Sequence, residues 1–206
     1  MDATRISELL APFLGEEKLA EHQLENISTY IDVLLKWNAR MNLTAVREPE
    51  QIVQRHFGES LFAARMLIAS GSTLSAVDVG SGAGFPGIPM KIYAPGLRST
   101  LIESHGKKAT FLREICRTLE LTNIDVFCGR AEDWKGTSEL VTLRAVERFD
   151  LILPIAAALV APQGRLALLI AAGQTTGLEK RLEGDWSDSI PVPNSRERVL
   201  KIWQRL

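Results

Sequence analysis

The first third of the chain has the hydrophobic periodicity of helices. Between residues 16 and 41, apolar side chains recur mostly every three or four positions, which is typical of one face of an amphipathic helix. A shorter helix is expected before this segment. After the helix-starting pair Glu48-Pro49, apolar residues at the same spacing continue to residue 66. Residues 1–70 are therefore predicted to form a helical cap.

From residue 71 onward, short segments rich in Val, Ile and Leu alternate with helical segments. This alternation predicts parallel strands joined by right-handed crossovers, in a doubly wound, mostly parallel α/β sheet. A final antiparallel pair is expected from residues 186–193 and 198–205, so residues 71–206 form the predicted core. The predicted strands are 75–79, 98–103, 123–128, 140–146 and 164–170, and the predicted helices are about 86–94, 106–120 and 149–160.

The composition and charge of the chain exclude only a few classes of protein. The 24 basic and 25 acidic residues give a net charge of -1, so any contact with RNA must come from local patches. The two cysteines, Cys116 and Cys128, lack metal-motif spacing, and the N-terminus lacks the basic and apolar regions of a secretory signal. The longest apolar stretch, residues 151–160, is too short to span a bilayer. A cytoplasmic protein without a metal site or membrane contact is expected.

A glycine-rich turn, VDVGSGAGFPG, follows the first predicted strand at residues 77–87. From Gly82 it formally matches the dinucleotide fingerprint G-x-G-x-x-G, but this alignment puts Pro86 inside the fingerprint. From Gly80, an acidic residue stands two positions before three alternating glycines, which is typical of an adenosylmethionine loop. An ordinary glycine-rich turn is the alternative for the pattern taken alone. The predicted cofactor loop contains Gly80, Gly82, Gly84 and Phe85.

The chemistry of the neighbouring residues favours the second alignment. Asp78 suits the cationic sulfonium of adenosylmethionine better than a pyrophosphate. The second predicted strand ends at Glu103, whose carboxylate can accept hydrogen bonds from ribose hydroxyls in either cofactor. The third strand is followed by Gly129-Arg130-Ala131-Glu132-Asp133, whose acidic or amide groups can reach an adenine edge, although solvated charges or a helix cap would also explain Glu132 and Asp133.

Further motifs are spread over nearly the whole chain. They are Trp37-Asn38 with Asn42-Leu43-Thr44, Arg55-His56-(x)2-Glu59-Ser60, Asp78-Val79-Gly80-(x)4-Phe85-Pro86-Gly87-Ile88-Pro89, Lys107-Lys108-(x)2-Phe111-Leu112, Arg144-Ala145 and Glu197-Arg198. Together they resemble the bacterial 16S ribosomal RNA guanine-N7 methyltransferases, once called glucose-inhibited division protein B. The Gly-Phe-Pro-Gly-Ile-Pro run is much more specific than the generic glycines.

This resemblance implies a Rossmann-like methyltransferase sheet with an N-terminal helical cap. It implies S-adenosylmethionine as cofactor, 16S ribosomal RNA or the small ribosomal subunit as partner, and a monomer as the expected state. Gly80 and Phe85 would belong to the cofactor loop, Ala131 and Glu132 would flank the adenine, and Arg144 would lie beside the cofactor. The chain departs from the family pattern at Glu59, which replaces an aspartate, at Leu143, which replaces a serine, and at Ile170, which replaces a lysine.

Four polar residues are candidates for contact with RNA. By resemblance His56 and Arg198 face RNA, although a helix-capping histidine and a surface arginine are equally plain interpretations. Lys107 and Lys108 begin the helix after Glu103, where a phosphate fits between them. Arg113 and Arg117 on the same helix are expected to form a solvated face.

The expected chemistry needs little from the protein beyond positioning. Guanine N7 carries a free lone pair, so no general base is required and no catalytic residue is assigned. Cys116 and Cys128 are expected in the core, not as nucleophiles. The alternatives are a small-molecule methyltransferase, a nicotinamide oxidoreductase, and a non-catalytic factor that binds ribosomal RNA or a ribosomal protein.

Overall fold

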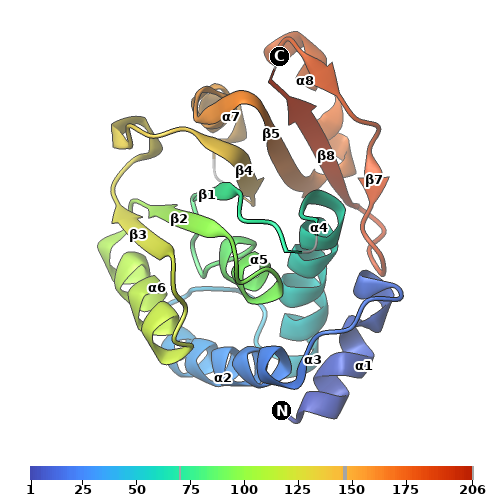
Figure 1. Ribbon diagram of the computed structural model, residues 1–206, viewed down its shortest axis with the longest axis vertical. Coiled ribbons are helices and arrows are strands. Elements are labelled where there is room, and N and C mark those ends of the chain that lie inside the picture. Colours follow the sequence, from blue (N-terminus) through green and yellow to red (C-terminus); the bar gives the residue numbers. More distant parts are fainter. Residues whose placement is uncertain (70, 146–147, 206) are drawn as a thin grey trace.

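The computed structural model describes residues 1–69, 71–145 and 148–205, and five parallel strands form its centre (Figure 1). β1 pairs with β2 and β4, β2 with β3, and β4 with β5, all in parallel. The strand order β3-β2-β1-β4-β5 reverses between β1 and β4, where open α/β sheets bind ligands at the carboxyl ends of the strands. The strands are β1 Ser75–Val79, β2 Arg98–Glu103, β3 Ile124–Cys128, β4 Ser138–Arg144 and β5 Val160–Ala171.

The sheet ends in antiparallel strands. β8 (Arg198–Gln204) pairs with β5, and both β6 (Asp185–Trp186) and β7 (Ile190–Pro191) pair with β8. The predicted antiparallel pair is therefore confirmed, except that its first strand is divided in two. The division falls at residues 187–189, where the side-chain oxygen of Ser187 accepts a hydrogen bond from Ile202 N at 3.0 Å. β5 also begins earlier than predicted, with a register shift against β4 between Ser138 and Leu140.

Helices precede the sheet as predicted. The cap contains α1 (Ala3–Leu14), α2 (Glu21–Asn38), and a continuous helical segment made of α3 (Pro49–Ile52), the π-helix η1 (Val53–Gly58) and α4 (Glu59–Leu67). α2 is shorter than the predicted 16–41, because its first turn is capped at Ala20, whose amide donates to Gln23 Oε1. The last residues of the predicted cap (70), of the predicted strand 140–146 and of the predicted core (206) lie outside the described residues.

Helices cover both faces of the sheet, which confirms the doubly wound α/β class. α7 (Phe149–Ala158) and α8 (Leu178–Arg181) pack on one face, against a cluster that includes Val77 and Val141. α5 (Gly87–Tyr93) and α6 (Gly106–Thr118) cover the other face, and α2 runs beneath them (Figure 1). The short 3-10 helices η2 (Ala131–Asp133) and η3 (Ala172–Thr175) follow β3 and β5.

The cap and the sheet share a hydrophobic core. Ile27 and Ile31 of α2 belong to the same buried cluster as Phe85 and Ile88 of the glycine-rich segment and Phe111 of α6. This packing fixes the cap against the carboxyl ends of the strands. Within the described residues, no helix is both long enough and apolar enough to cross a membrane.

Candidate cofactor and substrate site

Two cavities adjoin at the carboxyl ends of the central strands. The first, of about 290 Å³, lies beside α7 and η2 and is called the α7-side cavity. The second, of about 470 Å³, lies between the glycine loop and the cap and is called the cap-side cavity. Gly80, Ser104 and Ile152 line both of them. The two cavities therefore form one site at the position that the sheet topology favours.

Most of the predicted site residues line one of these cavities. Ala131 and Glu132 line the α7-side cavity with Gly129, Leu151 and Ile155. The cap-side cavity is lined by Leu43, Thr44, His56, Gly80, Gly82, Phe85, Glu103, Lys108 and Arg144, among others. Gly84 lines neither cavity, and an added Cβ there would collide with the Tyr30 hydroxyl group. Gly84 thus serves the contact between the loop and the cap.

The loop needs glycine because of its backbone. Gly80, Gly82 and Gly84 have φ values of 70°, 56° and 88°, in the left-handed region that favours glycine. The amides of Gly80 and Ser81 donate to the Ile102 carbonyl group, which ties the turn to β2. A Cβ at Gly82 would meet only Gly80 O, at 3.8 Å, so this surface of the loop is open to a ligand.

Asp78 lies beneath the loop and braces it. The residue is 3% exposed, and its carboxylate accepts hydrogen bonds from Thr142 Oγ1 at 2.8 Å and from Gly87 N at 3.2 Å. Burial raises its pKa to about 6, although these hydrogen bonds oppose the shift. Asp78 lines neither of the two joined cavities, so the structure gives it a bracing role in place of the expected contact with a cation.

Glu103 connects the loop with the site. Its carboxylate is 6% exposed and accepts hydrogen bonds from Gly82 N at 2.9 Å and from His105 N at 2.7 Å. A carboxylate has about four acceptor sites, so two remain for further donors. Both the residue and the open surface of Gly82 border the cap-side cavity, which supports a site for a ligand with hydroxyl groups.

Arg144, which lines the cap-side cavity, forms a buried ion pair with Glu59. Arg144 Nη2 lies 2.9 Å from Glu59 Oε2 and donates to Arg55 O at 2.7 Å. Arg198 Nε lies 3.5 Å from the same Glu59 oxygen. Burial lowers the pKa of Arg144, and the Glu59 carboxylate opposes this shift. The sequence motif predicts no role for Glu59, although its spacing of three from His56 predicts that both residues share a helix face.

His56 lies inside the wall of the cavity. Its Nε2 is 2.7 Å from Thr44 Oγ1, and its Nδ1 is 3.3 Å from Arg144 Nη2. Its ring stacks on Phe85 at a centroid distance of 4.8 Å, and Phe85 stacks in turn on Tyr30 at 5.4 Å. Burial, followed by the nearby arginines, lowers the pKa of His56 to about 3, so the imidazole is neutral at physiological pH.

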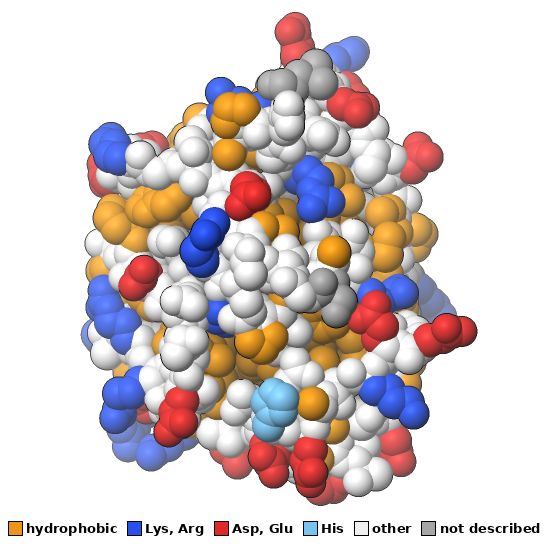
Figure 2. All heavy atoms as spheres, in the orientation of Figure 1, with side chains coloured by type: hydrophobic (Ala, Val, Ile, Leu, Met, Phe, Trp, Pro, Cys, Tyr) orange, Lys and Arg blue, Asp and Glu red, His pale blue; other side chains and the backbone are white. Residues whose placement is uncertain are grey.

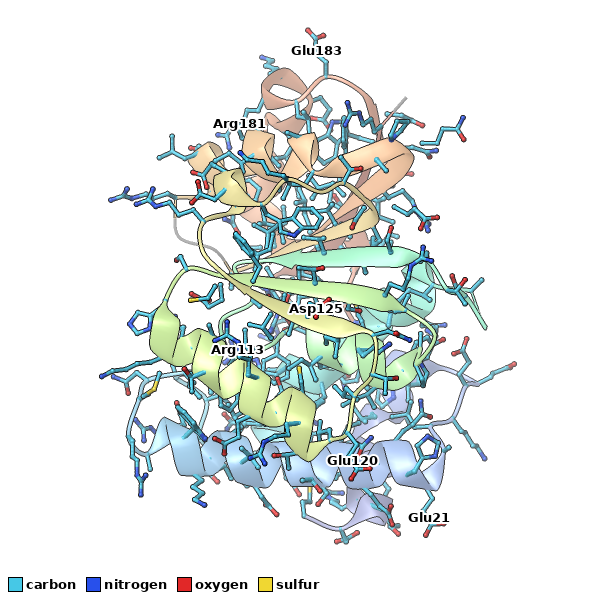
Figure 3. All side chains as sticks on the ribbon, turned by 60° about the vertical axis from the view of Figure 1, so that its left-hand side comes forward. Glu21, Arg113, Glu120, Asp125, Arg181 and Glu183 are labelled. Atoms are coloured by element: carbon cyan, nitrogen blue, oxygen red, sulfur yellow. The ribbon has the colours of Figure 1, made fainter. Side chains whose placement is uncertain are left out.

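The basic candidates are divided among three places. Lys108 lines the cap-side cavity, whereas Lys107 is exposed beside it. Arg198 lines a third cavity of about 510 Å³, beyond Glu59, together with Arg55 and Arg196. Arg113 lies between α6 and β3, where its Nη2 donates to Val126 O at 3.3 Å (Figure 3). Arg113 and Arg117 are both exposed, as expected for a solvated helix face, and this contact is an addition at Arg113.

Neither cysteine lines the two joined cavities. Cys116 is half-buried, and burial raises the pKa of its thiol to about 11, which keeps it protonated. Cys128 is exposed at the end of β3, so its predicted place in the core is wrong. β3 is an edge strand, so it has a neighbouring strand on one side only.

Two departures from the expected motifs lie in the apolar core. Leu143 and Ile170 are 0% and 2% exposed and belong to the cluster on the α7 face of the sheet. A phosphate contact from position 170 is therefore absent here, because the isoleucine side chain packs inside the sheet.

Comparison with known proteins identifies the family. The family model described as GidB, rRNA small subunit methyltransferase G, matches residues 23–186. A ribosomal RNA small subunit methyltransferase G from Lachnoclostridium phytofermentans is 44% identical over 137 residues, which cover 63% of this chain and 56% of that relative. One from Streptococcus agalactiae is 34% identical over 198 residues, covering 89% of this chain and 84% of the relative.

Solved methyltransferase structures share the fold at low sequence identity. A ribosomal protein L11 methylase from Lactobacillus delbrueckii aligns with a TM-score of 0.61 at 16% identity, over 74% of this chain and 80% of that chain. TYW2 from M. jannaschii, solved in complex with AdoMet, aligns with a TM-score of 0.57 at 15% identity, over 72% and 77% of the two chains. On the family match and the Streptococcus relative, this chain belongs to the rRNA small subunit methyltransferase G family.

Proposed function

We propose that this protein transfers a methyl group from S-adenosylmethionine to N7 of a guanine in 16S ribosomal RNA. One observation carries the proposal: a buried carboxylate, Glu103, accepts a hydrogen bond from the amide of the glycine loop in the wall of the cap-side cavity, next to Ser104, which lines both cavities. The names of the relatives support ribosomal RNA as the substrate, and the AdoMet complex of a neighbour with the same fold supports the cofactor. A cytoplasmic monomer acting on the small subunit is part of the proposal.

The residues present fit S-adenosylmethionine. Glu103 has acceptor sites left for the ribose hydroxyls, and Ala131 and Glu132 border the adjoining α7-side cavity, where an adenine fits. Gly80 and Gly82 offer an open backbone surface for the amino-acid portion, with Phe85 and Arg144 beyond them. When bound, the cofactor supplies an electrophilic methyl group on a sulfonium sulfur.

The site contains what transfer to N7 requires, and neither cysteine lines the two joined cavities. N7 of guanine presents a lone pair, so the protein has only to orient the base toward the methyl group. Arg144, held by Glu59, acts as a binding group at the cavity wall. The remote Cys116 thiol supports this assignment, because methylation of a pyrimidine carbon would require a thiolate nucleophile at the site.

We place the RNA along the basic residues at the mouth of the site. Lys107 and Lys108 begin α6 beside the cap-side cavity, and Arg198 lines the third cavity with Arg55 and Arg196. His56, in the wall of the cap-side cavity, is part of the proposed RNA-binding site. Figure 2 shows several Lys and Arg side chains on the left-hand side, where Figure 1 places α6, with Asp and Glu side chains among them as on the rest of this face. This pattern fits local phosphate contacts and not general adhesion to nucleic acid.

The proposal is tested with labelled S-adenosylmethionine and two substrates, protein-free 16S RNA and assembled small subunits. The methylated nucleotide is then located by mild reduction and aniline cleavage, which break the strand at N7-methylguanosine. We expect label at one guanine. Label at another atom, or none on either substrate, would contradict the proposal.

A further inference from the structure

The loop after α2 is held by a hydrogen-bond network that the cofactor site does not use. Asn38, 4% exposed, ends α2. Its Oδ1 accepts from Leu43 N at 2.8 Å and from Thr44 N at 3.0 Å, and its Nδ2 donates to Thr44 O at 2.9 Å. Both backbone polar groups of Thr44 are thus tied to one buried side chain. Thr44 is therefore positioned in the cavity wall before any ligand binds.

The side-chain oxygen of Thr44 accepts two hydrogen bonds. Val46 N donates to Thr44 Oγ1 at 3.1 Å, and His56 Nε2 lies 2.7 Å from the same oxygen. The guanidinium group of Arg144 can only donate, so His56 Nδ1, 3.3 Å from Arg144 Nη2, presents its lone pair. A neutral His56 then carries its proton on Nε2 and donates it to Thr44. The opposite tautomer would set two N–H groups against each other.

The hydroxyl proton of Thr44 is left without an acceptor. A hydroxyl group has two lone pairs and one proton, and both lone pairs are used here. Within the described ranges, Thr44 Oγ1 has no hydrogen-bonding partner besides Val46 N and His56 Nε2. Since Thr44 lines the cap-side cavity, its hydroxyl group offers one donor, held in position by these contacts, to a ligand that enters.

We propose that Thr44 selects guanine by donating this hydrogen bond to O6 of the base that receives the methyl group. The inference rests on the proposed function and adds to it the reason why guanine is chosen over adenine. Guanine presents acceptors at both N7 and O6, whereas adenine presents an acceptor at N7 and a donor at N6. N7 chemistry therefore does not distinguish the two purines. A donor fixed opposite position 6 does, because an adenine amino group would leave it unpaired.

The test combines changes in the protein with changes in the base. The target guanosine is replaced in reconstituted small subunits by inosine, which keeps the 6-oxygen, or by 2-aminopurine, which lacks it and keeps N7. Wild type should methylate guanosine and inosine with kcat/KM about 10-fold or more above that for 2-aminopurine, the loss expected for one unmade buried hydrogen bond.

Two variants separate the hydroxyl group from the shape of the side chain. Thr44→Ser, the matched control, should retain the preference. Thr44→Val should bring the ratio of guanosine to 2-aminopurine close to one, because only the guanosine rate falls. If the valine variant does not fold, Thr44→Ala also removes the hydroxyl group. Thermal unfolding of each variant checks that it is folded.

Three results would overturn the inference. Equal rate losses on both bases would make Thr44 purely structural. Weaker S-adenosylmethionine binding by calorimetry, with the base preference intact, would assign the hydroxyl group to the cofactor. Equal wild-type rates on guanosine and 2-aminopurine would show that position 6 is not read. If wild type methylates no guanine N7 at all, the proposed function fails first, and that result is visible before any variant is made.

Discussion

At the scale of single residues, Glu103 both holds the glycine loop in its conformation and lines the proposed cofactor site. Its carboxylate accepts from Gly82 N and His105 N and borders the cap-side cavity. Glu103→Ala should weaken S-adenosylmethionine binding by about 1.5–3 kcal/mol, the usual contribution of a hydrogen bond to a charged group, while the fold survives. Calorimetry measures this loss. Glu25→Ala, at an exposed position of α2, is the matched control, and unchanged affinity in the Glu103 variant would remove Glu103 from the cofactor site.

His56 links the stability of the fold to pH. Its pKa is about 3 in the folded chain and about 6.5 in a model peptide, so between these values the unfolded chain binds a proton that the folded chain does not. His56 therefore makes stability fall as the pH drops from about 6.5 toward 3. Asp78, whose pKa is raised from 3.8 to about 6, acts in the opposite direction between those two values.

Replacing the imidazole isolates its contribution to this pH dependence. In His56→Gln the free energy of unfolding should fall less steeply between pH 7 and pH 5 than in wild type. Urea titrations at several pH values measure the slope, with His22→Gln, exposed on α2, as the control. Parallel curves for wild type and His56→Gln would show that the imidazole is not kept neutral in the folded state.

At the scale of elements, the helical segment α3–η1–α4 assembles one wall of the site. The π-helix η1 carries His56, and Glu59 follows in the first turn of α4. An added Cβ at Gly58 would lie 2.6 Å from Phe13 Cε2, so glycine permits α1 to pack closely there. π-Helical turns are frequent at functional sites, because they alter the direction of side chains within a helix. Here the segment directs a histidine and a carboxylate toward Arg144.

The start of α6 provides the proposed phosphate contacts. Lys107→Ala with Lys108→Ala should raise the apparent KM for RNA and leave S-adenosylmethionine affinity nearly unchanged. Loss of two phosphate contacts should also make the slope of log affinity against log salt shallower by about 1–2 units. RNA binding across a salt series measures it. The adjacent basic pair of α8, changed by Lys180→Ala with Arg181→Ala, is the matched control, and superimposable slopes for wild type and the α6 variant would exclude these lysines from the RNA site.

At the scale of the whole molecule, Tyr30 connects the cap to the cofactor loop. This fully buried side chain of α2 donates from its hydroxyl group to Ala83 O at 2.5 Å. Tyr30→Phe leaves that buried carbonyl group without its partner and should lower the free energy of unfolding by about 1–3 kcal/mol. Affinity for S-adenosylmethionine should also fall, because Ala83 belongs to the loop that lines the site.

A second tyrosine provides the control. Tyr93 donates to Glu17 at the surface, so Tyr93→Phe should change the free energy of unfolding by only a few tenths of a kcal/mol. Urea unfolding of both variants makes the comparison. Equal stabilities for Tyr30→Phe and wild type would mean that the contact between the cap and the loop contributes nothing measurable to the free energy of unfolding.

The division of the chain into a cap and a core at residue 70 stays a prediction, although residues of both segments belong to one buried cluster.

The sequence alone determined the order of elements and one edge of the site. Helical periodicity before residue 70 and alternating segments after it follow from local side-chain spacing, which needs no distant partner. Because parallel strands bring their carboxyl ends to one edge, the positions of Gly80, Gly82 and Glu103 could be predicted to converge. The start of β5 at Val160 does not follow from the side-chain spacing, since the backbone there changes register against β4.

Only the tertiary structure decided which side chains meet. Asp78 turns toward α5 because side chains alternate along β1, and its register partner on β4 is Thr142. His56 and Glu59 lie far in the sequence from Arg144 and Arg198, and the contacts between these two pairs arise only when the cap packs on the sheet. The sequence named Thr44 within a motif without giving it a task. Its hydroxyl group acquires a direction only through Val46 and the distant His56, because a proton's orientation depends on partners that the local sequence does not specify.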